Sequence, residues 1–308
     1  MTLAIDARGL GKRFGTAEVL DGLDLAVAEG SVFALLGPNG SGKTTTINIL
    51  TTLVRPDRGA ASVAGCDVVR DPDGVRARIS LTGQSAAVDE ALTGRENLVM
   101  LGRLSGLGRR AAGRRADDLL DRFELVDAAG KRVSTYSGGM RRRLDLALSL
   151  VVATPVLFLD EPTTGLDPHS RLELWRIIGE IAAAGTTVFL TTQYLEEADR
   201  LANRIAVLDG GRIVAEGTAA ELKSTVGGDV VELRGADDEL LAELPTDGSV
   251  HGLRAAMDEL DGLEASGRTG SHVAIRRPSL DDVFLTITGA GRSADRSRAD
   301  HRLIETKG

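Results

Sequence analysis

Short apolar runs alternate with longer segments of helical periodicity through the middle of the chain. SVFALLG leads into TTINILTTL, VLFLD leads into RLELWRIIGEIAAAG, and TVFLTT leads into LEEADRLANRIAVLD. Alternation of this kind is typical of units in which a helix connects two parallel strands. The pattern therefore predicts an α/β core built on a parallel sheet.

Other segments depart from this alternation and predict additional subdomains. The pieces before Gly30 read as short strands with turns, which predicts an antiparallel β subdomain. Between about residues 86 and 153 the pattern is mostly helical, and Thr93 and Glu96 have the spacing of a capping box, so we expect a helical subdomain there. After ELKSTVGGD a new series of short strand-like and helical segments begins. We expect a main domain over 1–226, a small αβ domain over 227–289 and a disordered polar tail over 290–308.

Composition and charge narrow the classes of function. The chain has 308 residues and a net charge of -8, whereas a general nucleic-acid coat needs an excess of Lys and Arg to neutralise phosphates. We therefore expect no nucleic-acid partner, and we assign the basic segment RRAAGRR (109–115) to a solvated helical face. Cys66 is the only cysteine, which excludes an intrachain disulfide and a cysteine-based metal cluster.

The hydropathy pattern gives no sign of a membrane-spanning or exported segment. The first residues lack the apolar core of a signal peptide. The longest apolar tract, 144–159, contains Asp145 and Pro155 and is shorter than the roughly 20 residues that a spanning helix needs. We expect a cytosolic chain that owes any membrane role to a partner.

The stretch GPNGSGKT, Gly37 to Thr44, follows a predicted strand and precedes a predicted helix. It matches the pattern G-x-x-x-x-G-K-[ST], in which glycines let successive N-H groups wrap a β-phosphate at a helix N-terminus. Lys43 would supply a cation to the β- and γ-phosphates of ATP, and Thr44 a hydroxyl to Mg²⁺. The alternative is a glycine-rich turn with an incidental lysine. The flanking strand and helix favour the nucleotide site, and with it a P-loop NTPase core of the RecA-like kind.

Two acids end the apolar run VLFLDEP. Ligands bind at the carboxyl ends of strands in a parallel sheet, so Asp160 is placed to hold the Mg²⁺ shell. Glu161, the next residue, can accept a hydrogen bond from the attacking water. Both acids could instead be turn residues before Pro162, but the phosphate loop upstream favours the catalytic interpretation.

A second candidate anion site lies in YSGGMRRRLDLALSLVV. Ser137, Gly138 and Gly139 precede a predicted helix, and a hydroxyl, glycine N-H groups and a helix N-terminus together attract phosphate. One chain does not need two such sites for a single ATP, because the first loop already surrounds the β-phosphate. Two chains packed head to tail would use both. As the alternative, SGG is a loop leading into a helix and RRRL is a solvated face.

GPNGSGKT, YSGGM, LFLDEP and GLD, in that order, resemble the motifs of the ATP-binding subunit of an ABC transporter, over about residues 3–225. The resemblance implies a helical signature subdomain whose serine and glycines reach the ATP held by a partner chain, with Asp167 at the dimer seam. It implies Mg²⁺ contact for Gln84, otherwise an ordinary loop glutamine, and adenine stacking for Phe14, otherwise a core residue. Met140 departs from the glutamine commonest after SGG. The nucleotide-binding residues are then Phe14, Gly37, Pro38, Asn39, Gly40, Ser41, Gly42, Lys43, Thr44, Thr45, Gln84, Ser137, Gly138, Gly139 and Asp167, and the Mg²⁺ ligands are Thr44, Gln84 and Asp160.

Gln193, at the end of TTVFLTT, stands where most ABC ATPases have a histidine that bonds the γ-phosphate. A glutamine amide can donate a hydrogen bond to a phosphate oxygen, but it carries no imidazolium charge and relays no proton. We expect Lys43, Glu161 and Gln193 to form the catalytic set of a slow ATPase.

Glutamine at this position, together with the C-terminal stretch PSLDDVFLTITG, resembles the daunorubicin-resistance ATPases. Its apolar positions Leu280, Val283, Phe284 and Ile287 follow helical spacing, and Ser279 and Asp282 are placed to cap the helix. That face covers either its own small domain or a partner.

The resemblance implies a homodimer around two MgATP that drives a separate transmembrane permease at the cytoplasmic face of a bacterial membrane. A drug-like or other hydrophobic compound would be exported. A lipid or polysaccharide exporter is the closer alternative. A soluble ABC ATPase acting on DNA or ribosomes is disfavoured, because the chain has no room for a long coiled coil between the Lys43 and Asp160 motifs and carries one cassette instead of two. A non-hydrolysing regulatory module is kept open by Gln193 but disfavoured by the intact Lys43, Asp160 and Glu161.

Overall fold

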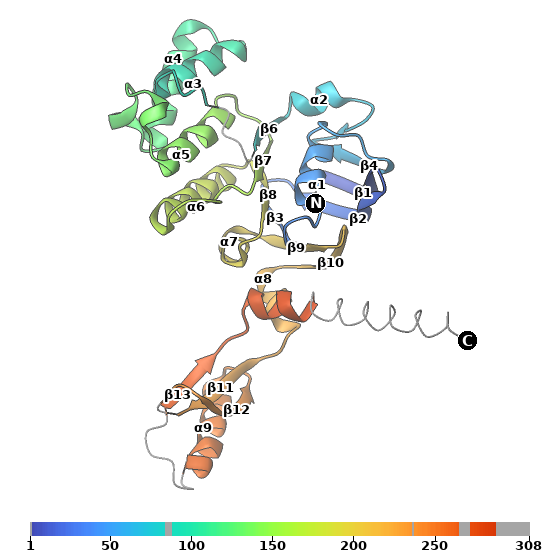
Figure 1. Cartoon of the computed structure of the whole chain (residues 1–308), viewed down its shortest axis with the longest axis vertical. Helices are drawn as coiled ribbons and strands as arrows, with labels where there is room; N and C mark the ends of the chain where they lie inside the picture. Colours follow the sequence, from blue (N-terminus) through green and yellow to red (C-terminus); the bar gives the residue numbers. More distant parts are fainter. Residues whose placement is uncertain (1, 84–87, 236, 265–271, 288–308) are drawn as a thin grey trace, which may run out of the picture. The chain divides into compact units, whose positions relative to one another are not determined.

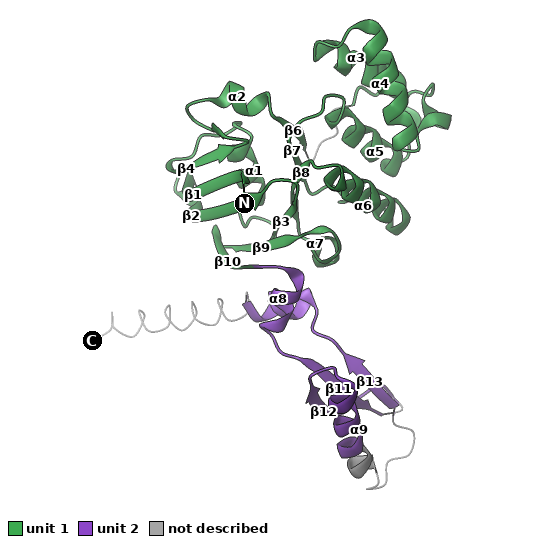
Figure 2. Cartoon of the chain, turned by 180° about the vertical axis from the view of Figure 1, so that it is seen from behind, with its two compact units in different colours: residues 1–216 green, residues 217–308 purple. Residues whose placement is uncertain are grey.

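The computed structural model describes residues 2–83, 88–235, 237–264 and 272–287. The chain forms two compact units, 1–216 and 217–308, coloured separately in Figure 2. The dividing point precedes helix α8 (Ala219–Ser224), whereas we expected a small domain to begin at Gly227. The expected tail, 290–308, and Gln84 lie outside the described residues. Each unit is described by itself.

The first unit is built on a six-stranded sheet with the order β10-β9-β3-β8-β7-β6. Strands β6, β7, β8, β3 and β9 pair in parallel, which confirms the α/β core. The three central strands are buried along their whole length, as expected for a parallel sheet covered on both faces. The strands are β3 (Val32–Leu36), β6 (Ile79–Thr82), β7 (Val156–Asp160), β8 (Thr187–Thr192), β9 (Arg204–Asp209) and β10 (Arg212–Gly217).

An antiparallel sheet of order β2-β1-β4-β5 packs on the same side of the core as helix α1 (Lys43–Leu50) (Figure 1). The sheet confirms the expected antiparallel subdomain and comprises β1 (Leu3–Phe14), β2 (Ala17–Ala28), β4 (Arg58–Val63) and β5 (Cys66–Asp67). One apolar cluster joins this sheet, α1 and the strands of the parallel sheet. At its centre the rings of Phe33 and Phe189 stack with centroids 5.6 Å apart.

Helices α6 (Pro168–Ala183) and α7 (Leu195–Leu201) cover the opposite face of the parallel sheet (Figure 1). The region between β6 and β7 is helical, with the capping box of Thr93 and Glu96 present as predicted. Its elements are α3 (Gly94–Leu104), α4 (Arg109–Arg122), α5 (Gly138–Ser149) and two short 3₁₀ turns, Val126–Ala128 and Val133–Thr135. A further short helix, α2 (Pro72–Arg76), precedes β6.

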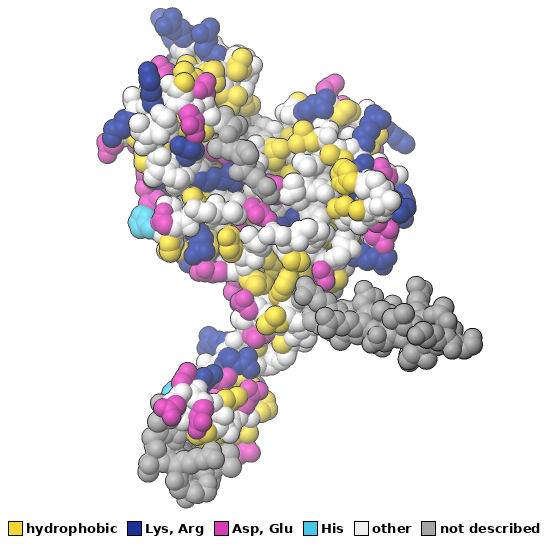
Figure 3. Space-filling view, in the orientation of Figure 1, with side chains coloured by type: hydrophobic (Ala, Val, Ile, Leu, Met, Phe, Trp, Pro, Cys, Tyr) yellow, Lys and Arg dark blue, Asp and Glu magenta, His cyan; other side chains and the backbone are white. Residues whose placement is uncertain are grey.

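The basic face predicted for 109–115 is largely solvated. Arg109, Arg110 and Arg114 are exposed, and Figure 3 shows Lys and Arg side chains gathered at the end of this helical region. Arg115 departs from the prediction, because its guanidinium turns inward and donates to the carbonyl oxygens of Leu150 (2.6 Å) and Val151 (3.2 Å).

The second unit carries an antiparallel sheet of order β12-β11-β13 against helix α9 (Val250–Glu264). Its strands are β11 (Asp229–Arg234), β12 (Leu240–Thr246) and β13 (His272–Arg276). A small core forms around Val231 and Leu260. The last described helix, 280–287, has the predicted cap, since Ser279 Oγ accepts from the N-H of Asp282 at 3.2 Å. Leu280 and Val283 are buried there.

Candidate functional site

The loop Gly37–Thr44 joins β3 to α1, as the pattern predicts. Gly40 and Gly42 have φ of 81° and 111°, a left-handed backbone that favours glycine. A Cβ at Gly42 would lie 2.7 Å from the Cδ2 of Leu20, so the loop is also pressed closely against β2. The backbone therefore turns tightly ahead of a helix N-terminus.

The two side chains of the loop that matter for phosphate are both buried. The Lys43 ammonium donates to the carbonyl oxygens of Gly37 (2.8 Å) and Pro38 (3.1 Å) and lies 3.3 Å from Oε1 of Glu161. The Ser41 hydroxyl is buried without a hydrogen-bond partner among the described residues. A buried cation and an unsatisfied hydroxyl beside glycine N-H groups fit a bound phosphate chain.

Asp160 ends β7 and is held by neighbours from two other elements. The hydroxyl of Thr191, its register partner on β8, donates to Oδ1 at 2.5 Å, and that of Thr44 on α1 lies 3.4 Å from the same oxygen. A hydroxyl and a carboxylate side by side at the carboxyl edge of a sheet are oxygen ligands of the kind Mg²⁺ takes in P-loop proteins. The donor set fits the ion.

Glu161 follows Asp160 in a left-handed backbone conformation, with φ of 48°. Such a conformation is uncommon outside glycine and is strained for a longer side chain. The Glu161 N-H donates to both the carbonyl and the hydroxyl oxygen of Thr191, each at 3.1 Å. This turn directs the carboxylate toward Lys43 and into a cavity of about 540 Å³ that Asn39, Gly40, Gly42, Lys43, Thr44, Thr45 and Val19 also line.

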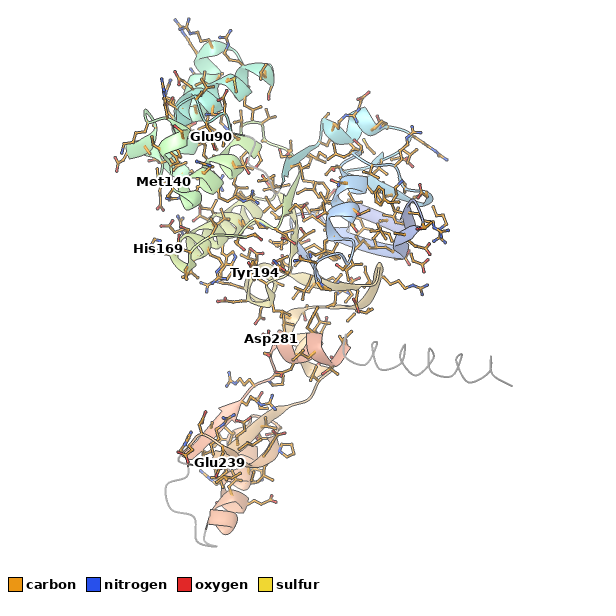
Figure 4. The ribbon with its side chains drawn as sticks, viewed as in Figure 1. Glu90, Met140, His169, Tyr194, Glu239 and Asp281 are labelled. Atoms are coloured by element: carbon orange, nitrogen blue, oxygen red, sulfur yellow. The ribbon has the colours of Figure 1, made fainter. Side chains whose placement is uncertain are left out.

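The SGG turn caps α5. Ser137 Oγ accepts from the N-H of Met140 at 3.2 Å, and Ser137 and Gly138 are exposed while Gly139 is buried. A Cβ at Gly139 would overlap Oγ of Ser170 on α6, so glycine is required where the two helices meet. Figure 4 labels Met140 on α5 and His169 on α6 along this side of the unit.

Asp167 caps α6 in the same way, since Oδ1 accepts from the Ser170 N-H at 3.0 Å and Oδ2 from its hydroxyl at 2.7 Å. These bonds hold the pKa of Asp167 below its usual value. A second cavity, of about 260 Å³, lies between α5 and the loop after β7 and is lined by Gly138, Arg141, Arg142, Glu161, Thr164, Gly165 and Leu166. Of the residues that the structure describes, Glu161 is the one that lines both cavities.

Two other predicted residues lie at the edges of the site. Gln193 follows the last residue of β8 and is partly buried. Phe14 ends β1 and is 50% exposed, with the Lys12 ammonium 5.3 Å from its ring centroid, so the alternative of a core phenylalanine is wrong.

Behind the loop after β8, Glu197 is fully buried and accepts from the indole N-H of Trp175 at 2.9 Å. Burial raises the pKa of its carboxyl above the usual range.

Sequence reasoning missed several residues that the structure brings to the site, among them Arg141, Thr164 and Leu166 in the second cavity. Thr191 holds Asp160, Val19 lines the phosphate-loop cavity, and Arg142 lies beneath the acids. The Arg142 side chain is only 11% exposed, so the solvated face considered for RRRL is wrong at this position. Burial lowers the pKa of its guanidinium, and the carboxylates of Asp145, Asp160 and Glu197 oppose that shift. The one sequence signal for this burial is Asp145, an acid inside the apolar tract of α5, which needs a positively charged partner such as Arg142 when it is buried.

The phosphate loop, the acids that end β7 and the SGG-capped helix define an ATP-binding cassette. The model of the family described as "ABC transporter" matches residues 20–164. The chain is 53% identical over 307 residues to the daunorubicin resistance ATP-binding protein DrrA2 of Streptomyces coeruleorubidus, covering 93% of this chain and 95% of the relative. It therefore belongs to the family of ABC transporter ATP-binding proteins, which are ATPases, and within it to the group of the daunorubicin resistance ATP-binding proteins.

Two further matches are another relative in sequence and a solved structure that shares the fold. The Nod factor export ATP-binding protein I of Burkholderia lata is 41% identical over 294 residues, covering 92% of this chain and 97% of that protein. A solved ATP-binding cassette, a dimer in a post-hydrolysis state bound to ADP and Pi, has a TM-score of 0.63 and 24% identity, covering 70% of this chain and 98% of its own. Within the described ranges, no helix has both the length and the apolar character that crossing a bilayer requires.

Proposed function

We propose that this chain is the ATP-hydrolysing subunit of an exporter, that it dimerises around two MgATP, and that it drives a separate membrane permease for a drug-like compound. The observation that carries the proposal is the convergence of Lys43, Asp160 and Glu161 at one sheet edge, in a chain that is similar over nearly its full length to a daunorubicin resistance ATP-binding protein. We place it at the cytoplasmic face of a bacterial membrane.

The site residues divide the work of hydrolysis. Lys43 and the loop N-H groups bind and orient the β- and γ-phosphates, and Thr44 and Asp160, with Gln84 outside the described residues, would hold Mg²⁺. Bound Mg²⁺ supplies charge neutralisation on the phosphate oxygens. Glu161 accepts a hydrogen bond from the attacking water and orients it, and Gln193 donates to the γ-phosphate.

Dimerisation is supported by the separation of the two cavities. Gly138 lines only the cavity next to the SGG turn, while the phosphate loop lines the other, and the N-terminus of α5 is exposed at Ser137 and Gly138. An exposed anion site that its own phosphate loop does not share suits the nucleotide of a second chain. The dimeric cassette bound to ADP and Pi supports the same arrangement by analogy.

A groove between the helical region and the edge of the parallel sheet supports a protein partner. Its lining includes Leu81 on β6, Leu101 on α3 and Val152, which is 39% exposed. Leu104, next in the sequence to the lining residue Ser105, is 77% exposed. Exposed apolar side chains beside a groove mark interaction surfaces. We infer that the permease docks here.

Purification of the chain from solubilised membranes of its host, followed by mass spectrometry, tests the partner. A stoichiometric polytopic protein is the expected result. Leu104→Asp should release it, whereas Val214→Asp, a similar change at a half-exposed valine on β10, should not. Recovery with ribosomes or DNA, or loss of the partner in both variants, would refute the permease interface.

The dimer has its own test. Glu161→Gln should form a dimer with ATP in light scattering, and Ser137→Arg in the same background should stay monomeric. A monomer with saturating ATP in the first variant would contradict the proposed dimer.

The relative named for Nod factor export favours a second candidate, export of another class of compound. The co-purified permease separates the two, because transport of each compound can be measured with it in vesicles.

A further inference from the structure

Arg142 lies in the first half of α5, but its guanidinium reaches the loop that follows β7. Nε donates to the carbonyl oxygen of Pro162 at 2.7 Å, and Nη2 to those of Asp160 and Glu161 at 3.3 and 3.4 Å. Nη1 donates to the carbonyl oxygen of Gly83 at 2.8 Å and to Oδ2 of Asp145 at 3.1 Å. One side chain thus binds three successive carbonyls at the end of β7 and just beyond it, together with one carbonyl after β6.

These bonds fix the backbone of Glu161 from both sides. The carbonyls of Asp160 and Glu161 belong to the two peptide groups that flank the Glu161 Cα, so holding both oxygens restrains φ and ψ of that residue. Glu161 has φ of 48°, a conformation that persists only where surrounding contacts impose it. Thr191 restrains the same turn through the Glu161 N-H. The direction of the Glu161 carboxylate therefore depends on a guanidinium from another helix.

The charge and shape of arginine both matter here. Asp145, whose side chain is 3% exposed, neutralises the buried charge of Arg142 and holds its guanidinium in the orientation that reaches the loop after β7. A guanidinium presents its donors across a plane, whereas a lysine ammonium donates from one point and cannot span four carbonyls. Among the described residues, Arg142 makes no hydrogen bond to the phosphate loop 37–44. Its contacts therefore restrain the backbone of Asp160 and Glu161 and leave the phosphate-binding loop untouched.

We propose that Arg142 is a positioning residue for ATP hydrolysis, which holds Glu161 in its left-handed conformation and ties the SGG-capped helix to the loops after β6 and β7. It acts through Glu161 and not on the nucleotide, and in this it rests on the role proposed above for Glu161. Nucleotide affinity and turnover should therefore respond differently to its loss.

The experiment compares Arg142→Lys and Arg142→Gln with the wild-type full-length chain. We expect kcat to fall about tenfold or more in both, while the Kd of a fluorescent ATP analogue stays within about threefold. Arg143→Lys is the matched control, because Arg143 lies on the same helix with similar exposure (15%) but pairs with Glu124 and Glu173. It should lose no more than about threefold in kcat.

Several results would overturn the proposal. A kcat within about twofold of wild type in Arg142→Gln would do so, as would a parallel loss of affinity and turnover or the same split in Arg143→Lys. Thermal unfolding of each variant identifies one that has failed to fold, and Arg142→Lys, the conservative change, then decides. Glu161→Gln is measured beside them. If it keeps wild-type turnover, the role of Glu161 fails; if it collapses turnover while Arg142→Gln does not, only the role of Arg142 fails.

Discussion

Replacement of Thr191 by valine tests whether the Asp160 carboxylate depends on a neighbouring strand. The Thr191 hydroxyl donates to Oδ1 of Asp160 at 2.5 Å, and both residues are buried. Valine keeps the shape and β-propensity of threonine but, among the described residues, leaves that carboxylate oxygen with only the longer contact to Thr44, 3.4 Å.

The structure sets the size of the effect. Valine also removes the hydroxyl oxygen that accepts from the Glu161 N-H. That N-H keeps a partner, because the backbone carbonyl oxygen of residue 191 accepts from it at 3.1 Å. The loss is then one hydrogen bond to a charged group, worth about 1.5 to 3 kcal/mol. Valine creates no cavity, so we expect the free energy of unfolding to fall by about 2 kcal/mol.

Urea unfolding followed by tryptophan fluorescence measures this change. Trp175 is the only tryptophan and is buried in the first unit, so its emission reports that unit. Thr191→Ser is the control: it keeps the hydroxyl and loses one methyl group, which costs about 1 kcal/mol. Valine costing no more than serine would refute the stabilising role of the Asp160 bond.

Three further predictions concern the acids and the amide around the site. Glu161→Gln should bind ATP as wild type does and lose most of its turnover, by about a hundredfold, in steady-state ATPase assays; wild-type rates would remove the residue from catalysis. Gln193→His should keep ATP binding and hydrolyse at least as fast, and loss of binding would contradict its placement. Because burial raises the pKa of Glu197, the folded state holds a proton there that the unfolded chain releases, so this group makes stability fall as pH rises from the ordinary glutamate pKa of 4.5 toward the raised pKa. Stability measured against pH in Glu197→Gln should lack that component; identical slopes in both proteins would contradict it.

The parts of the site that depend on local backbone could be predicted from the sequence. The phosphate loop needs glycine where φ is positive, and the acids stand at the end of an apolar run, so Lys43 and Asp160 are visible as motifs. The capping box of α3 is local in the same sense. The fold class could also be predicted, because the alternation of strand and helix patterns is local and visible in the sequence.

The partners of these residues could not be predicted, because they depend on strand order and helix packing. Thr191 meets Asp160 only because β8 lies between β3 and β7 in the register Asp160 to Thr191. Arg142 sits in a basic triplet that looks solvent-facing, and its burial depends on where α5 meets the loops after β6 and β7. Neither relation leaves a periodic signal.

The order of strands has a consequence for synthesis of the chain on the ribosome. Strand β8 lies between β3 and β7 in the sheet but follows both in the sequence. The phosphate loop is therefore made long before the strand that joins β3 to β7, and Phe33 has no Phe189 to stack against until about 150 further residues have been added. Because β9, the other neighbour of β3, also follows β8 in the sequence, a nascent chain that stops before β8 would leave both edges of β3 and one edge of β7 unpaired. It would also lack the Thr191 bond to Asp160. Such fragments should need a chaperone, and ATP should first bind productively only when β8 has left the ribosome.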